Sequence, residues 1–118
     1  MELKIGGYER DVLRRGGGME IVEITWPSGT RTRKHNHNAH GRVRVMRGRI
    51  FEIRSGKKVY YEAGENFLEI EGDVPHIIGN DSNSVAVTRH IYEPELTMET
   101  FEDDANDIAA LAQEAPVL

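Results

Sequence analysis

The chain has 118 residues, 38% of them hydrophobic and 30% charged, which suits a single globular domain with a buried core. It contains no cysteine, so disulfides and thiolate metal ligands are excluded. It has neither a transmembrane-length apolar run, nor a signal-peptide stretch, nor a basic stripe with interleaved aromatics. We therefore expect a cytoplasmic protein that binds neither membrane nor nucleic acid.

Short strand-like runs recur along the chain, separated by clusters of Gly, Pro, Asn and Ser. The segment that ends at Gly18 is compatible with either a short helix or a strand. Regularly spaced short strands predict an all-β sandwich or barrel. The expected strands cover residues 19–26, 30–37, 42–46, 49–53, 59–62, 67–70 and 84–92.

Only the C-terminal residues have a helical pattern. Asn106 or Asp107 is the expected N-cap, because short polar side chains satisfy the first backbone N–H groups of a helix. Ile108, Leu111 and Ala115 follow at helical spacing, and a proline comes directly after them.

The basic residues are unevenly distributed: ten of the fifteen Lys and Arg residues lie between Arg31 and Lys58, where Glu52 is the only acid. This segment could bind an anionic partner, or its charges could form the solvated outer face of half-buried strands. Alternation favours the second interpretation, with Arg42, Val43, Arg44 and Val45 in one strand and Phe51, Glu52, Ile53 and Arg54 in the next.

Histidines form the strongest functional signal in the sequence. His35 and His37 form an H-x-H pair, and His76 lies in the sequence P-H-I-I-G-N. Residues i and i+2 of a strand share a face, so the pair can direct two imidazoles at one point. A third histidine would complete a metal site with open positions for substrate. Alternatively, the pair and His40 lie on a polar surface loop, and His76 is a hydrogen-bonded core residue.

Three neutral imidazoles would leave the full charge of a divalent metal uncompensated. Such a site favours an anionic substrate that binds the metal directly, and it can leave a position for dioxygen. Imidazole suits Fe, Zn, Cu, Ni and Mn, so the ligand set alone does not identify the metal.

Two stretches resemble the cupin motifs. Gly29 to Gly48 is similar to the first motif, G-x5-H-x-H-x3/4-E-x6-G, and His76 to Asn80 match the H-x3-N that ends the second. The second motif departs from the pattern near Ile70, where proline is usual. The resemblance implies a single-domain cupin barrel, a jelly roll or double-stranded β-helix, over about residues 19–93. A helical tail is expected over about residues 104–118.

The acidic ligand of the first cupin motif is absent, with Gly41 at its position. In this respect the chain resembles the thiol dioxygenases, three-histidine Fe(II) cupins of which cysteine dioxygenase is the best-known member. Their Y-x-R is matched by Tyr8-Glu9-Arg10, and their S-x-H-x-Y by Thr88-Arg89-His90-Ile91-Tyr92.

The resemblance implies that His35, His37 and His76 hold one Fe(II), although Mn, Ni or Zn could occupy the same ligands. It implies that Arg10 binds the substrate carboxylate through its planar guanidinium and that Tyr8 closes over the substrate. An ordinary surface arginine is the alternative for Arg10.

Thr88, His90 and Tyr92 lie at i, i+2 and i+4, so they face one side of the last long strand. If that side is buried, their polar groups must bond to one another. Thr88 would orient His90, and His90 would position the Tyr92 phenol for catalysis; a purely structural trio is the alternative. Trp26 continues the apolar face of its strand and is expected in the core.

The favoured function is addition of dioxygen to the sulfur of a small thiol carboxylate, L-cysteine giving cysteine sulfinate. Its partners would be a small thiol and dioxygen, and a homodimer is possible. One alternative is another metal-dependent cupin enzyme that acts on a small carboxylic acid. The other is a non-catalytic cupin that binds a small ligand.

Overall fold

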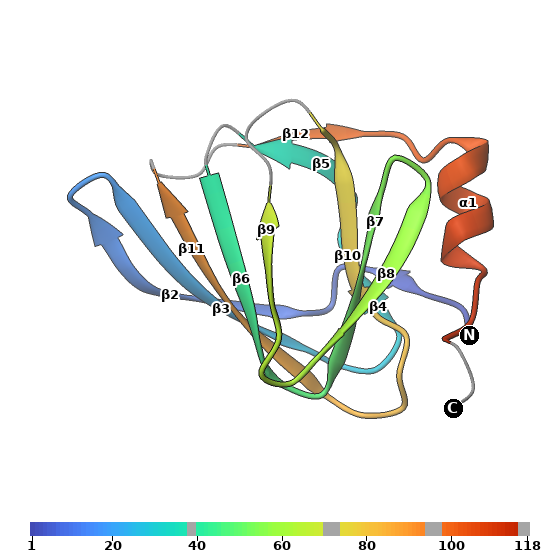
Figure 1. The fold of residues 1–118 in the computed structure, drawn as a ribbon, viewed down its shortest axis with the longest axis horizontal. Helices are drawn as coiled ribbons and strands as arrows, with labels where there is room; N and C mark the ends of the chain where they lie inside the picture. Colours follow the sequence, from blue (N-terminus) through green and yellow to red (C-terminus); the bar gives the residue numbers. More distant parts are fainter. Residues whose placement is uncertain (38–39, 70–73, 94–97, 116–118) are drawn as a thin grey trace.

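The computed structural model describes residues 1–37, 40–69, 74–93 and 98–115, which form two facing β-sheets and one helix (Figure 1). The first sheet contains, in hydrogen-bonded order, β2 (Glu9–Gly16), β3 (Met19–Trp26), β11 (Ala86–Glu93), β6 (His40–Arg47) and β9 (Asn66–Glu69). The second runs in the order β1 (Lys4–Ile5), β4 (Thr30–Arg31), β10 (His76–Asn80), β5 (Lys34–His37) and β12 (Met98–Phe101). In addition, β7 (Arg49–Arg54) pairs with β10 and with β8 (Lys57–Glu62), and the helix α1 spans Ala105–Leu111.

The predicted all-β architecture is confirmed, although β1, β10 and β12 were not among the expected strands and two of the predicted segments differ. The segment before Gly18 is a strand, β2, which forms a hairpin with β3 and contains a bulge between Val12 and Arg14. The expected strand over residues 30–37 is divided into β4 and β5, which pair with different parts of β10.

The barrel interior follows the two-residue period of the strands. In β3 the buried residues are Glu20, Val22, Ile24 and Trp26, and the residues between them are partly exposed. In β6, Val43 and Val45 are buried, whereas Arg42 and Arg44 are exposed, as the alternation predicted. The apolar inner residues form one cluster that also includes Ile50, Phe67, Ile78 and Ala86.

The same interpretation is wrong for β7, because this strand is covered on both faces. Phe51 and Ile53 pack with Ile77 and Ala110 in a second cluster beneath α1. Glu52 points to the opposite side of the strand and is buried, with 6% of its surface exposed. The alternating pattern therefore marks two different buried faces here, one apolar and one on which Glu52 lies beside the buried Ile50.

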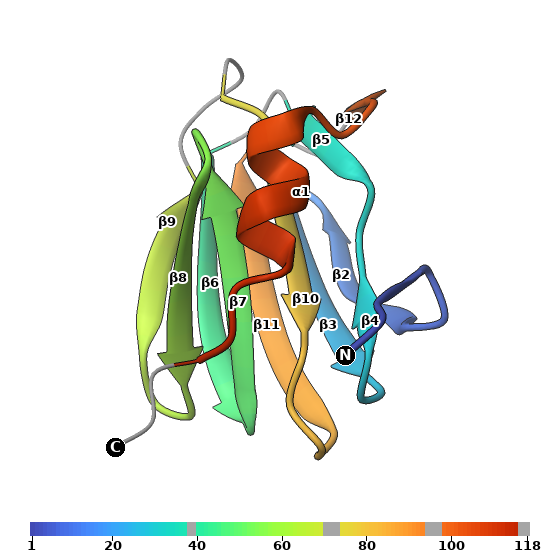
Figure 2. The same ribbon diagram turned by 90° about the vertical axis from the view of Figure 1, so that its right-hand side faces the viewer.

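The N-cap lies earlier than predicted, and the helix ends at Leu111, so Ala115 lies outside it. Asp104 is the N-cap and forms a capping box with Asp107, so the cap precedes the predicted position at Asn106 or Asp107. Ala110 is fully buried, whereas Ile108 is 60% exposed and does not form the packing face. Figure 2 shows α1 lying across the outside of the second sheet. Within the described ranges, no helix is long and apolar enough to span a membrane.

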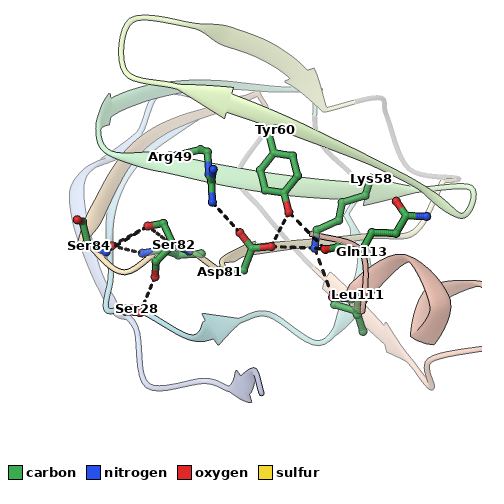
Figure 3. A network of polar contacts seen from close by, with 10 residues as sticks. Ser28, Arg49, Lys58, Tyr60, Asp81, Ser82, Ser84, Leu111 and Gln113 are labelled. Atoms are coloured by element: carbon green, nitrogen blue, oxygen red, sulfur yellow. Dashed lines mark hydrogen bonds and ion pairs between the residues drawn. The ribbon is translucent and has the colours of Figure 1, made fainter. Parts of the chain in front are cut away.

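Lysine side chains hold both ends of α1 against the barrel. Lys34 Nζ lies 2.8 Å from Asp107 and 3.3 Å from Asp104 in the capping box. At the other end, buried Lys58 donates to the carbonyl oxygens of Leu111 and Gln113 and to Asp81 (Figure 3).

Asp81 connects the side chains near the C-terminal end of α1. Besides Lys58, it accepts hydrogen bonds from the Tyr60 hydroxyl at 2.6 Å and from Arg49 at 3.3 Å. Burial alone would raise the pKa of the Asp81 carboxyl, but these hydrogen bonds and the charges of Lys58 and Arg49 hold it below its usual value. A charged carboxylate therefore joins β8 to the segment after β10.

Gly48, which closes the first cupin-like motif, provides a test of how tightly the strands meet. Its φ of +75° favours glycine, and an added Cβ would lie 2.7 Å from the Val85 carbonyl oxygen. Gly17 has a φ of +63° but nothing within 4 Å of an added Cβ.

We expect Gly17→Ala to lower the free energy of unfolding by about 1–2 kcal/mol from its backbone conformation alone. Gly48→Ala should cost about 1–3 kcal/mol more from the clash, measured by urea unfolding. Equal losses would contradict this explanation.

Candidate metal centre

Two neighbouring strands bring the three histidines together. His35 and His37 project from the same face of β5, and His76 opposes His35 directly in the antiparallel ladder between β10 and β5. All three side chains are buried, with residue exposures of 7%, 4% and 2% in chain order. The Nε2 atom of His76 lies 3.1 Å from Nε2 of His35 and 3.2 Å from Nε2 of His37. The structure therefore forms a compact three-nitrogen group that could hold a metal ion.

Oxygen acceptors fix the orientation of two of these rings. Nδ1 of His35 lies 2.8 Å from the carbonyl oxygen of Arg33, and Nδ1 of His76 lies 2.7 Å from the Glu52 carboxylate. Because both oxygens only accept hydrogen bonds, each neutral ring carries its proton on Nδ1 and has a lone pair on Nε2. When both rings are neutral, their two lone pairs face each other at 3.1 Å in a buried site.

A cation between these nitrogens would convert that repulsion into attraction. With metal–nitrogen bonds of about 2.1 Å, the two separations that involve His76 correspond to N–metal–N angles of about 95–100°. Three histidine ligands gathered in this way can leave other positions of the metal for further ligands. The chemistry and spacing of the donor set therefore fit a divalent transition metal.

Glu52 contacts one of the three histidines, which the sequence interpretation did not predict. Its carboxylate accepts from His76 Nδ1 and also from Arg54, whose Nη2 lies 2.6 Å away. Carboxylate–histidine contacts of this kind orient a metal ligand and raise its basicity. One feature of the sequence could have indicated this contact. Glu52 is the only acidic residue between Arg31 and Lys58, so it differs from the basic residues that surround it in the chain.

The residues Thr88, His90 and Tyr92 project into the barrel from β11 and form a hydrogen-bonded row. Thr88 Oγ1 lies 2.7 Å from His90 Nε2, and His90 Nδ1 lies 3.0 Å from the Tyr92 hydroxyl. The Tyr92 ring meets the His37 ring edge to face, with 5.4 Å between the centroids. The row therefore begins beside the histidine group, although its catalytic role remains a prediction.

The same row extends to a residue predicted only as core. Trp26 is fully buried, as expected, and its indole Nε1 donates to Thr88 Oγ1 at 2.9 Å. Sequence patterns gave no sign of this contact, because it joins residues 62 positions apart.

Gly41 and His40 lie at the start of β6. Gly41 is buried and opposes Tyr92 in the ladder between β6 and β11, so no side chain occupies the position of the usual acidic cupin ligand. His40 is exposed and opposes Glu93. Among the described residues, the metal-competent group consists of histidines alone and does not include His40.

Arg10 and Tyr8, predicted to contact substrate, lie on or beside β2. The Arg10 guanidinium is 2.6 Å from buried Glu20, which opposes Tyr92 in the ladder between β3 and β11. Arg15 contacts the other oxygen of Glu20 at 2.9 Å. Tyr8 packs against Trp26 with ring centroids 4.7 Å apart, and burial raises the pKa of its hydroxyl. The structure places Arg10 in an ion pair, and its contact with substrate remains a prediction.

Comparisons with known proteins give a fold and no family assignment. No family model and no curated protein matches the chain. An uncharacterised protein with a double-stranded β-helix domain from Klebsiella pneumoniae has a TM-score of 0.73, with 16% identity over 86% of this chain and 91% of that chain. An RmlC-like cupin from Methanocaldococcus jannaschii has a TM-score of 0.68, with 17% identity over 74% of this chain and 80% of that chain.

A third similar structure is a protein from Acidithiobacillus ferrooxidans described as a putative sugar phosphate isomerase. Its TM-score is 0.66 and its identity 18%, over 79% of this chain and 64% of that longer chain. Together with the sheet topology, these similarities confirm the predicted cupin double-stranded β-helix. They do not distinguish the thiol dioxygenases from other cupins.

We predict that Glu52→Gln weakens metal binding about 10- to 100-fold, because amide replaces carboxylate behind His76. The measurement is competition of Co(II) or Zn(II) between the protein and a chromogenic chelator. Glu23→Gln is the matched control, since Glu23 pairs with Arg89 on the partly exposed face of β3. An unchanged affinity in Glu52→Gln would show that the carboxylate does not support the metal site.

Glu20 predicts a pH dependence of stability. Burial would raise the pKa of its carboxyl, but hydrogen bonds from Arg10 and Arg15 and their charges outweigh burial and lower it. A lowered folded-state pKa adds stability above the unfolded-state pKa, and this contribution is lost as the pH falls through the folded-state value. Glu20→Gln should cost about 1–2 kcal/mol near neutral pH, allowing for the exposure of both arginines.

The difference in the free energy of unfolding between wild type and Glu20→Gln should shrink as the pH is lowered from about 5 toward 3. It should stay constant from about pH 6 to 9. Urea midpoints at each pH give both curves. A difference that grows on acidification would contradict the assigned ion pairs.

Proposed function

We propose that this protein is a metal-dependent cupin oxygenase that adds both atoms of dioxygen to the sulfur of a small thiol carboxylate. L-cysteine, giving cysteine sulfinate, is the first candidate. The observation that carries the proposal is the convergence of three buried Nε2 atoms beside the Tyr92 phenol, with no carboxylate in the group among the described residues.

The neutral ligand set supports an anionic substrate and a redox-active metal. Three imidazoles leave the metal charge uncompensated, which favours a thiolate over a neutral ligand. Bound Fe(II), held by His35, His37 and His76, would supply Lewis acidity toward the thiol and electrons for activating dioxygen. A thiol and dioxygen together give a sulfinate and a proton, so the reaction needs no further oxidant or reductant.

Tyr92 and Arg10 would orient the substrate in this proposal. Tyr92 lies against His37, so its hydroxyl can serve a ligand on the open side of the histidine group. Arg10 would take the substrate carboxylate with two charge-assisted hydrogen bonds. Since Glu20 already holds Arg10, the substrate carboxylate would have to share the guanidinium with it.

The same ion pair favours a second candidate. If Glu20 keeps Arg10 neutralised, a substrate bound mainly by the metal is preferred over one bound by the arginine. Mn- or Ni-dependent chemistry on a small carboxylic acid that coordinates the metal directly would use the same three histidines.

Oxygen consumption tests the proposal directly. Protein loaded anaerobically with Fe(II) should consume oxygen when L-cysteine or 3-mercaptopropionate is added, with one sulfinate formed per dioxygen. His76→Ala should abolish both, because it removes one of three metal ligands. No uptake with either thiol, despite bound iron, would reject thiol dioxygenation and leave the Mn- and Ni-dependent reactions to be assayed.

Arg10 can be tested against a neighbour with the same ion-pair partner. Arg10→Gln should raise the KM for L-cysteine about 10- to 100-fold through loss of charge-assisted hydrogen bonds. Arg15→Gln removes the other contact to Glu20 and is the matched control, with an unchanged KM expected. Equal effects of both substitutions would assign Arg10 to support of Glu20 and not to substrate binding.

A further inference from the structure

The hydrogen-bonded row that starts at Tyr92 ends on a group that can only donate. From the far end, Trp26 Nε1 contacts Thr88 Oγ1 at 2.9 Å, Thr88 contacts His90 Nε2 at 2.7 Å, and His90 Nδ1 contacts the Tyr92 hydroxyl at 3.0 Å. Trp26, Thr88 and His90 have at most 1% of their surface exposed. Bulk water therefore cannot set the protonation pattern of the inner part of the row.

Trp26 fixes the direction of the first hydrogen bond. An indole N–H has no acceptor capacity, so Thr88 Oγ1 must accept from it. The Thr88 hydroxyl still has its own proton, and a buried O–H without an acceptor is costly. Within the described parts of the chain, its other hydrogen-bond contact is His90 Nε2. Thr88 therefore donates to that nitrogen.

The donor in the next hydrogen bond, between His90 and Tyr92, follows from the same reasoning. An Nε2 that accepts from Thr88 carries no proton, so the neutral His90 ring carries its proton on Nδ1. That proton is donated to the Tyr92 oxygen at 3.0 Å. Because the oxygen accepts from His90, Tyr92 directs its own hydroxyl proton to a third group and not back along the row.

We propose that Trp26 is a positioning residue: its N–H sets the direction of proton donation through Thr88 and His90, so that Tyr92 donates to an anionic ligand at the three-histidine site. The identity of that ligand as substrate rests on the proposed function. The direction of the row does not, since it follows from the donor capacity of the indole.

Packing holds the indole in the required orientation. Trp26 is the last residue of β3, and Tyr8 covers its ring with a centroid separation of 4.7 Å. Its backbone carbonyl is bound by the side-chain amide of Asn80 at 3.0 Å. A fixed donor at this place acts without any conformational change in the barrel.

The single tryptophan of the chain allows a nearly isosteric test. Biosynthetic replacement by the benzothiophene analogue of tryptophan keeps the ring shape and removes only the N–H. We expect ¹⁵N NMR of metal-free native protein to show His90 protonated on Nδ1. In the analogue, Thr88 becomes free to accept from Nε2, so the Nε2 resonance should move toward its protonated position. Thermal unfolding and near-ultraviolet dichroism would verify that the fold is retained.

Two results would overturn the proposal: a native His90 protonated on Nε2, or an unchanged tautomer in the analogue. Trp26→Phe provides a second variant with the same expectation. His90→Gln assigns the signal, which is needed because the chain has five histidines.

The link to the metal site has a separate readout. Anaerobic L-cysteine binding to Fe(II)-loaded protein should weaken about tenfold in Tyr92→Phe and in Trp26→Phe, and by no more in the double variant, since both remove the same donated hydrogen bond. Additive losses would overturn the link between Trp26 and Tyr92. Absence of L-cysteine binding in native protein would count against the proposed thiol substrate, while the NMR result would still decide the direction of the row.

Discussion

The arrangement of this barrel depends on one costly juxtaposition, three buried imidazoles in which Nε2 of His76 lies within 3.2 Å of Nε2 of both His35 and His37. His35 and His37 occupy one face of β5, and the ladder places His76 opposite His35. β5 is held between β10 on one side and β12 on the other, so its register is determined from both edges. Arg31 and Lys34, which precede the ligand pair in the chain, form ion pairs with Asp103, Asp104 and Asp107 around the start of α1. The C-terminal segment thus holds the ligand strand in place.

The barrel interior changes character along its length. At one end, Trp26 and Ala86 meet in the apolar cluster. Toward the other end, the inner positions of β11 become polar, and the ladder ends near Tyr92 opposite Glu20. Such an interior can remain stable because its polar side chains are hydrogen-bonded to one another or to charges. Polarity is concentrated where the histidines lie, and the apolar end supplies the packing that holds the polar row in position.

The fold was predictable because period-two alternation and regular turns determine strands and their inner faces. The histidine group was also predictable, since H-x-H spacing needs only strand geometry to bring two rings together. Glu52 and the Thr88 partner of Trp26 were not, because each contact joins distant strands whose pairing the sequence does not reveal. The alternation in β7 was misinterpreted for the same reason: only the position of α1 shows that Phe51 and Ile53 face a second apolar cluster. The helix cap was misplaced because Asp104, Asn106 and Asp107 are all suitable N-caps, and only the backbone decides among them.

The two oxygens behind His35 and His76 differ in a way that matters for how such a site can change over evolutionary time. One is the main-chain carbonyl of Arg33, which every amino acid at that position provides, and the other is the side chain of Glu52. Substitution can therefore alter the electron donation of His76 in one step, whereas that of His35 changes only if the path of the backbone changes. A lineage of such proteins could diversify the electronic character of its metal through residue 52 while keeping the remaining ligand geometry intact.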